Sequence, residues 1–361
     1  MPGDVKMAQL ERDGEIGLSE YAPGSEIVAD GKLFRSGGID LQHKELERRQ
    51  YRVCNMCRRV EFFAESQPVP RACGACGCIP KGPLGVARKY VRPPGFTTLF
   101  EEPVEEPNLF RLRPPPNSEV FLVQGADEDA FSVHASFPNI CCGYTQNGQL
   151  FRANPGRKYK AFRICIKCGR YFDKTPRKPD HDTPWGSACR GAYIIATDLA
   201  FQFDTDTLQL RFLGAPSTPP VSDESFWLSL QTAFVSAAAE VLSIPTNDIA
   251  ATYHDGPNGH PELVIYDRVP GGAGYVDRIR RDLRAIFEVA FKRTSQCRNP
   301  LCDSAGSCYA CLRSYGNQFK WAQLNRGRVA AWLSELLSIP SVSEETDSSS
   351  IGAAAAPAVL P

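Results

Sequence analysis

Cysteine pairs are the residues of this sequence whose type and spacing most directly indicate chemistry. The chain contains 14 cysteines, and several form Cys-x-x-Cys pairs, which place two thiolates on one tight turn. Zinc takes four such ligands at the corners of a tetrahedron. A C-x4-C-x5-C-x2-C run supplies four of them: Cys297, Cys302, Cys308 and Cys311. Buried free thiols are the alternative, but this spacing favours a structural zinc site.

A second set of four cysteines lies in the N-terminal third of the chain. Its spacing, C-x2-C-x15-C-x2-C, is typical of a zinc ribbon: Cys54, Cys57, Cys73 and Cys76. Cys78 is an additional thiol that could replace Cys76, although the two-residue spacer favours Cys76. The neighbouring Arg58 and Arg59 either offset the negative charge of four zinc-bound thiolates or belong to an ordinary solvated surface.

A third pair, Cys165-x-x-Cys168, leaves its other ligands open, and Cys141 and Cys142 are candidates by residue type. The segment around this pair is basic, with aromatic residues such as Phe162 and Trp185 between the charges. Such a pattern suits a phosphate backbone and stacked bases, whereas a solubilising loop is the alternative. We expect nucleic-acid contact from nine residues: Arg157, Lys158, Lys160, Arg163, Lys167, Arg170, Lys174, Arg177 and Lys178.

Composition limits the function classes. The 361 residues carry 41 Lys plus Arg and 41 Asp plus Glu, a formal net charge of zero, so any nucleic-acid contact must be a local patch. The N-terminus lacks a signal-peptide pattern, and no apolar run approaches the ~20 residues that span a bilayer. We therefore expect a soluble cytoplasmic protein without membrane contact, in which clustered cysteines bind metal and do not form disulfides.

These sites must be positioned by an α+β fold, in which small β-rich zinc-ribbon modules precede an α/β domain with a C-terminal four-cysteine zinc knuckle and helices. The predicted division is a β element at 1–53, a zinc ribbon and Pro-rich connector at 54–117, a β region with the second knuckle and basic patch at 118–191, the α/β domain at 192–340, and a disordered tail at 341–361.

Alternating and helical patterns place the main elements. Glu119–Gln124 is expected to pair with Phe131–Phe137, and Ala192–Phe203 to form a hairpin with Leu208–Leu213 across the turn at 204–207. A helix is predicted from Ser225 to the residues before Pro245, because its apolar residues recur on one helical face. Further helices are predicted after the glycine run at 271–274 and from about Asn325 to Leu337.

Two other groups of residues are weaker candidates for chemistry. The glycine run Gly271, Gly272 and Gly274 either presents helix-start amides to a phosphate or permits tight strand–helix packing, which we favour. A hydrolytic metal site would draw on four residues: His254, Asp255, His260 and Asp267. Neighbours on a strand point to opposite faces, which argues against it. Four-ligand cysteine sites are closed to water and are therefore structural.

The run from Asp267 to Arg326 resembles the MrfA-type zinc-binding domain, which follows the motor of some superfamily-two DNA helicases and has a relative in DrmB of the DISARM phage-defence system. The resemblance is carried by Asp267, Pro270-Gly-Gly-Ala-Gly-Tyr275, the four cysteines with Leu312, Asn317-Gln318, and Leu324-Asn325-Arg326. Upstream, Glu20-Tyr-Ala-Pro-Gly-Ser25, Asp30-Gly31 and the paired-cysteine segments extend it from Glu20 to about Leu337. The departure is that no Walker A or Asp-Glu-Ala-His box is present.

The resemblance implies a His and then a Cys after the third pair, which selects His181 and Cys189 with the spacing C-x2-C-x12-H-x7-C. It also implies a non-catalytic accessory protein with two or three structural Zn²⁺ ions. This protein would contact DNA and a superfamily-two helicase in trans, in DNA processing or phage defence. The alternatives are a protein scaffold without DNA contact and a metal-dependent nuclease or hydrolase.

Overall fold

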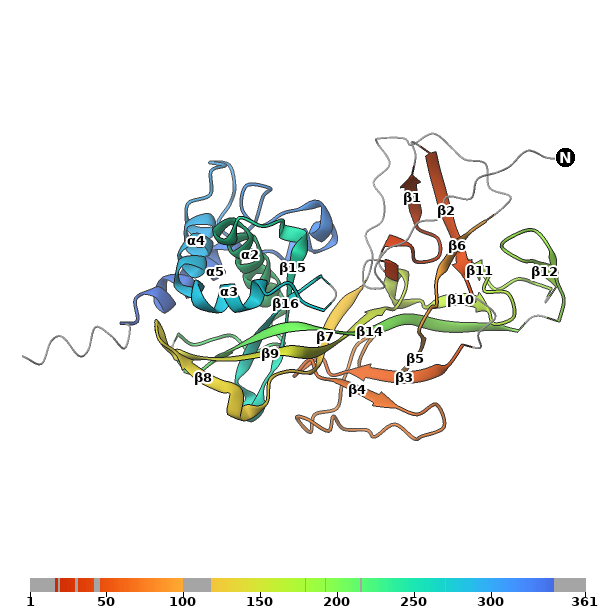
Figure 1. The fold of residues 1–361 in the computed structure, drawn as a ribbon, viewed down its shortest axis with the longest axis horizontal. Coiled ribbons are helices and arrows are strands. Elements are labelled where there is room, and N and C mark those ends of the chain that lie inside the picture. Colours follow the sequence, from red (N-terminus) through yellow and green to blue (C-terminus); the bar gives the residue numbers. More distant parts are fainter. Residues whose placement is uncertain are drawn as a thin grey trace, which may run out of the picture.

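The structure, a computed structural model, describes residues 17–18, 20–29, 32–41, 46–99, 118–178, 180–191, 193–214, 216–269 and 271–340. Figure 1 shows a helical region and a β-rich region, joined by two long strands that run from one to the other. The expected α+β class is confirmed. The Asp30-Gly31 turn, most of the proline-rich connector and the tail from 341 lie outside the described residues.

The two long strands, β9 (Phe137–Asn154) and β14 (Ile194–Phe212), form an antiparallel pair. They pair from Leu199 opposite Asn154 to Phe212 opposite Ile140, with one bulge between Thr205 and Thr207. The prediction of a hairpin across residues 204–207 is therefore wrong. Because β9 is long enough to pair with both halves of β14, the polar segment of β14 stays extended, and the bulge places two β9 residues, Gln146 and Asn147, opposite Asp206.

The first half of β14 organises the β-rich region. There it pairs antiparallel with β10 and parallel with β5, and β3 and β4 continue the sheet beyond β5. A separate three-stranded sheet has the order β1-β2-β6, in which Ala29 pairs with Lys32 across the expected turn. The strands of this region are β1 (Glu26–Ala29), β2 (Lys32–Ile39), β3 (Arg48–Val53), β4 (Val60–Phe63), β5 (Arg88–Val91), β6 (Phe96–Thr98), β10 (Phe162–Cys165), β11 (Tyr171–Phe172), β12 (His181–Asp182) and β13 (Ala188–Cys189).

The second half of β14 pairs with β16 (Pro261–Asp267), which pairs with β15 (Ile249–Asp255). On the other side, β7 (Glu119–Gln124) and β8 (Phe131–His134) each pair with β9, so the expected pairing of these two segments with each other is wrong. The sheet curls until β7 meets β15, where the Thr252 hydroxyl donates to the Val120 carbonyl at 2.6 Å. Buried apolar side chains, including Leu150 and Tyr266, fill the curl.

Four helices cover the face of β14, β16 and β15 that does not face the curl (Figure 1): α2 (Glu224–Leu242), α3 (Tyr275–Arg281), α4 (Leu283–Ser295) and α5 (Arg326–Leu337). Asp223 caps α2 by accepting from the Phe226 amide at 3.2 Å, and Asn325 caps α5. The helices predicted before Pro245 and at the C-terminus are thus confirmed, whereas the one predicted after the glycine run is two helices, with a break at Asp282.

Short 3-10 turns complete the described elements: η1 (Glu128–Ala130), η2 (Arg157–Tyr159), η3 (Thr246–Asp248), η4 (Pro257–Gly259) and η5 (Tyr315–Gln323). Helix α2 is also the one described helix that is long and apolar enough to cross a bilayer by length and composition. In the fold it is the central core helix, because Trp227 and Phe234 are fully buried against the sheet and the other helices.

Candidate zinc centres and basic surface

Three groups of four side chains bring their ligand atoms together, and in each group all four atoms lie within 4.8 Å of one another. At a Zn–S distance of about 2.3 Å, tetrahedral geometry places two sulfurs about 3.8 Å apart. The donor sets therefore fit zinc. The three groups contain all twelve side chains expected from the sequence: Cys54, Cys57, Cys73 and Cys76; Cys165, Cys168, His181 and Cys189; Cys297, Cys302, Cys308 and Cys311.

The first group lies between β3 and the loop after β4. The Sγ atoms of Cys57 and Cys73 are 3.7 Å apart, and those of Cys54 and Cys76 are 3.6 Å apart. A fifth thiol is present, because Cys78 Sγ lies 3.4 Å from Cys54 Sγ and 3.0 Å from Cys76 Sγ. Either Cys76 or Cys78 is therefore close enough to supply the fourth ligand.

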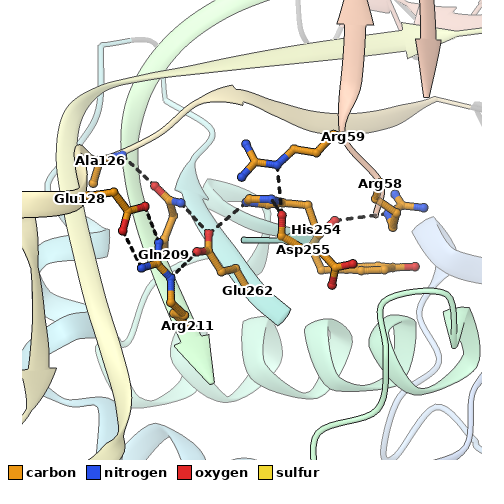
Figure 2. Close-up of polar contacts among 10 residues, drawn as sticks. Arg58, Arg59, Ala126, Glu128, Gln209, Arg211, His254, Asp255 and Glu262 are labelled. Atoms are coloured by element: carbon orange, nitrogen blue, oxygen red, sulfur yellow. Dashed lines mark hydrogen bonds and ion pairs between the residues drawn. The ribbon is translucent and has the colours of Figure 1, made fainter. Parts of the chain in front are cut away.

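This first group is attached to the helical half of the molecule through the residues that follow Cys57 (Figure 2). The Asp255 amide on β15 donates to the Cys57 carbonyl at 2.9 Å, and Arg59 Nε donates to the Asp255 carbonyl at 3.1 Å. Arg58 lies over the ring of Tyr253 at 4.3 Å and pairs with Glu119 at 3.3 Å. Both arginines follow Cys57 directly in the sequence, but their docking role depends on β15, which is almost two hundred positions away.

The second group joins a knuckle to a hairpin. Cys165 ends β10 and Cys168 lies in the turn that follows, and His181 pairs with Cys189 across strands β12 and β13. Cys168 Sγ lies 3.3 Å from His181 Nε2, and Cys165 Sγ lies 4.0 Å from Cys189 Sγ. The open alternatives, Cys141 and Cys142, lie on β9 opposite Arg211 and Leu210, outside this group.

The third group connects α4 to α5. Cys297 Sγ lies 3.5 Å from Cys308 Sγ, and Cys302 Sγ lies 3.9 Å from Cys311 Sγ. Arg326, at the start of α5, donates to the Thr294 carbonyl at 2.8 Å and to the Cys302 carbonyl at 2.9 Å. One arginine thus ties the metal loop to the end of one helix and the beginning of the other, so ordering the loop also orders the helix pair.

In each group one thiol ionises more readily than an ordinary cysteine. A hydrogen bond from Cys168 lowers the pKa of Cys165 to about 5, although burial opposes it. Burial also opposes ionisation of Cys76 and Cys308, yet hydrogen bonds from Cys78 and from the Ala310 backbone, respectively, help to lower the pKa of each to about 7. Thiolate is the form that binds metal, so one ligand of each group is readily ionised at neutral pH. In contrast, burial raises the pKa values of Cys57 and Cys311, and a neighbouring thiol together with burial raises the pKa of Cys168.

His254, one of the four residues considered for a hydrolytic metal site, belongs to a buried structural network around Glu262. Glu262 is fully buried; its Oε1 accepts from Arg211 Nε at 2.7 Å, and its Oε2 accepts from Gln209 at 2.7 Å and lies 3.1 Å from His254 Nε2 (Figure 2). Burial raises the pKa of Glu262, but the hydrogen bonds from these neighbours outweigh it and lower that pKa to about 2. Among the described residues, His254, Asp255, His260 and Asp267 do not form a metal-ligand group.

The glycine run uses its amides internally. Asp267 Oδ2 accepts from the amides of Ala273 at 2.7 Å and Tyr275 at 3.1 Å. Gly272 has a φ of +80°, and a Cβ there would collide with the Asp206 carboxylate. These contacts support the tight-packing interpretation, because a buried carboxylate occupies the position that a phosphate would need.

The nine basic residues expected to contact nucleic acid divide into two kinds. Arg163, Lys167 and Arg170 donate to the backbone carbonyls of Asp173, Arg190 and Asp182, at 3.1, 2.7 and 2.8 Å. The other six are exposed and form no ion pair in the part of the chain that the structure describes: Arg157, Lys158, Lys160, Lys174, Arg177 and Lys178. Arg163, Lys167 and Arg170 therefore hold the segment in shape, whereas the six exposed side chains can contact a polyanion.

Three comparisons with known proteins bear on these sites. Residues 230–312 match the MrfA Zn-binding domain family, which confirms the resemblance and the zinc cofactor. Druantia protein DruE of Escherichia coli (strain UMEA 4076-1) is 24% identical over 348 residues, covering 86% of this chain and 18% of DruE. The chain thus spans less than a fifth of that relative's length. The crystal structure of the DUF1998 helicase MrfA bound to DNA has a TM-score of 0.40 at 12% identity, and the match covers 90% of this chain and 31% of MrfA. The crystal structure of MrfA bound to DNA and AMPPNP has a TM-score of 0.36 at 11% identity, and the match covers 90% of this chain and 29% of MrfA.

Proposed function

Since residues 230–312 match the MrfA Zn-binding domain family, we propose that this chain is a non-catalytic accessory module of a DNA helicase and contacts DNA through its second zinc centre. The observation that carries the proposal is the set of six exposed basic side chains that form no ion pair among the described residues; they lie on η2, on the residue after it, and on the segment between β11 and β12. A phosphate backbone is the partner that such exposed cations attract most strongly, because each neutralised phosphate releases counterions.

The twelve side chains of the three groups are the proposed zinc ligands, and the zinc they hold has a structural role. Each group offers four protein ligands, which leaves no open position for a substrate or a reactive water. Zinc binding stabilises finger peptides by about 10–16 kcal/mol, compared with the about 5–15 kcal/mol of a whole domain. Three such sites therefore hold short β elements and loops in fixed positions around the basic segment.

The proposed partner is a superfamily-two helicase motor in trans, in the cytoplasm, with a role in DNA processing or in phage defence of the DISARM kind. The family match and the motifs shared with post-motor regions of such helicases support this assignment. Co-purification of the tagged chain with a candidate motor tests it. Retention of the motor through a high-salt wash is the expected result, and a motor that elutes with untagged controls would contradict the partnership.

DNA contact is tested by binding measurements at several salt concentrations. Replacing Lys158 and Lys160 by Ala removes one exposed cation from η2 and one from the residue that follows it. Lys292→Ala is the control, because Lys292 on α4 is exposed and forms no ion pair among the described residues. We expect the double variant to bind more weakly and to reduce the slope of log K against log salt by about 1.5, since each phosphate contact contributes roughly 0.7–0.9. A slope equal to that of the wild type would contradict contact at η2.

A protein scaffold is the second candidate, and the third zinc centre favours it. Leu301 is 92% exposed and Tyr309 is 64% exposed, on the loops that carry the ligands of that centre. Tyr309 also packs edge-on against Trp321, with ring centroids 5.1 Å apart. Exposed aromatic and aliphatic side chains on a rigid loop are typical of a protein interface. Loss of motor co-purification in Tyr309→Ala, with DNA affinity unchanged, would support a scaffold role for this loop.

A further inference from the structure

The hairpin of the second zinc centre presents an aromatic side chain to solvent. Strands β12 and β13 carry His181 and Cys189 at paired positions, and Trp185 lies in the turn between them, 51% exposed. Figure 1 shows this hairpin at the end of the β-rich region, remote from the four helices. In the part of the chain that the structure describes, the indole of Trp185 makes no ring or cation contact.

The turn that holds Trp185 is rigid. The Thr183 amide donates to the Ser187 carbonyl at 2.6 Å, and the Ser187 amide donates to the Thr183 hydroxyl oxygen at 3.0 Å. Gly186 closes the turn by donating to the Thr183 carbonyl at 3.1 Å. Because the strands that carry this turn also carry two proposed zinc ligands, the backbone of Trp185 is held close to those ligands, and less backbone freedom is lost when a planar partner binds.

A second exposed aromatic lies beside the same centre. Tyr193 is 62% exposed, and its carbonyl accepts from the amide of Ile166 in the Cys165–Cys168 knuckle at 3.0 Å. The other aromatic residues of the segment are not available: Phe172 packs against His181, with ring centroids 4.9 Å apart, and Phe162 is buried against Tyr171. The surface around this centre therefore offers two free aromatic side chains, Trp185 and Tyr193.

We infer that the second zinc centre binds single-stranded nucleic acid, with Trp185 as a base-stacking residue and Tyr193 as a further stacking surface. This rests on the proposed function, because the six free cations supply the attraction for the phosphates. Exposed aromatic side chains beside a cationic track are the arrangement that binds single strands without sequence preference. In a duplex the faces of the bases are covered by their neighbours, so a protruding indole selects the unpaired strand.

The test compares a labelled single-stranded oligonucleotide with its duplex, using Trp185→Ala, Trp185→Phe and the matched control Tyr309→Ala. Tyr309 is an exposed aromatic on another zinc knuckle, with 64% of its surface exposed against 51% for Trp185. We expect Trp185→Ala to weaken single-strand binding by roughly 5- to 100-fold, as for removal of one stacked aromatic, with duplex binding unchanged. Trp185→Phe should retain most of the affinity, Tyr309→Ala all of it, and each variant the zinc content of the wild type.

Intrinsic fluorescence gives an independent readout. Of the other three tryptophans, Trp227 and Trp332 are buried, and Trp321 packs against Tyr309 at the third zinc centre, so quenching by a strand bound at the second centre should come mainly from Trp185 and should disappear in Trp185→Phe. If Trp185→Ala binds both oligonucleotides as well as the wild type, or weakens both equally, this inference is overturned while DNA contact by the basic segment stands. If the wild type binds neither oligonucleotide, both the inference and the proposed DNA contact fail.

Discussion

Arg58 and Gly169 occupy the same position in two zinc knuckles, directly after the second cysteine, and both have left-handed backbones, with φ values of 56° and 77°. Glycine adopts this conformation without steric cost, whereas a residue with a Cβ adopts it only at a cost in conformational energy. At Arg58 the strain coincides with the contacts to Tyr253 and Glu119 that dock the first zinc centre on the helical half. Strained residues persist where surrounding contacts fix them.

The first prediction separates the strain at Arg58 from its contacts. Arg58→Gly and Arg58→Ala both remove the guanidinium, but only the alanine keeps a Cβ in the left-handed region. We expect both variants to be less stable than the wild type, and the glycine variant to be more stable than the alanine variant by about 1 kcal/mol. Denaturant unfolding of the zinc-loaded proteins measures this difference; an alanine variant as stable as the glycine variant would contradict the strain.

The second prediction concerns the fifth thiol of the first centre. Because Cys78 Sγ lies 3.4 Å from Cys54 Sγ, it is close enough to take the fourth position when Cys76 is absent. Cys76→Ser and Cys78→Ser should each retain all three zinc ions, whereas the double variant should lose one of the three. Zinc per chain, measured by elemental analysis, decides the point. Loss of one ion from Cys76→Ser alone would show that Cys78 cannot substitute.

The third prediction follows from Glu262. Its pKa is about 2 in the folded protein, against an ordinary value of 4.5, so its ionised form stabilises the fold above pH 4.5. That stabilisation, about 3 kcal/mol by linkage, is lost as the pH falls from 4.5 towards 2. In Glu262→Gln the difference in unfolding free energy from the wild type should be large at neutral pH and should shrink with acid. A pH-independent difference would contradict the assigned pKa.

The fourth prediction uses two neighbouring glycines. Gly271 and Gly272 have φ values of +76° and +80°, but only a Cβ at Gly272 would meet the Asp206 carboxylate. Alanine at either position should incur the same left-handed strain, and Gly272→Ala should be destabilised further. Thermal unfolding should therefore give a lower midpoint for Gly272→Ala than for Gly271→Ala. Equal midpoints would argue against close packing of the glycine run on β14.

Sequence spacing anticipated the zinc centres because a tetrahedral site formed from Cys-x-x-Cys turns is encoded locally. His181 is different: it lies on a short hairpin whose pairing with Cys189 depends on the metal and the fold, so only the resemblance selected it. The continuous course of β14 was missed for a related reason. Residues 204–207 are polar and turn-prone, and only the distant partner β9 keeps them extended. Helices α2 and α5 were predicted because their apolar periodicity and caps are local.

The docking of the first centre on β15 also could not be predicted. Arg58 and Arg59 have the residue types of an ordinary basic surface, and their contacts with Tyr253 and Asp255 join segments almost two hundred positions apart. The buried row of Arg211, Glu262 and His254 likewise depends on strand register. Long-range pairing fixes such contacts, and residue type alone does not reveal them.

The central claim is that three bound zinc ions fasten the β elements and the α4–α5 loop into one platform. Native mass spectrometry of the purified chain, with circular dichroism before and after chelation, tests it most directly. We predict three zinc ions per chain, loss of cooperative unfolding when they are removed, and loss of one ion with disordering of α5 in Cys308→Ser. A chain that contains less than one equivalent of zinc and still unfolds cooperatively would contradict the account.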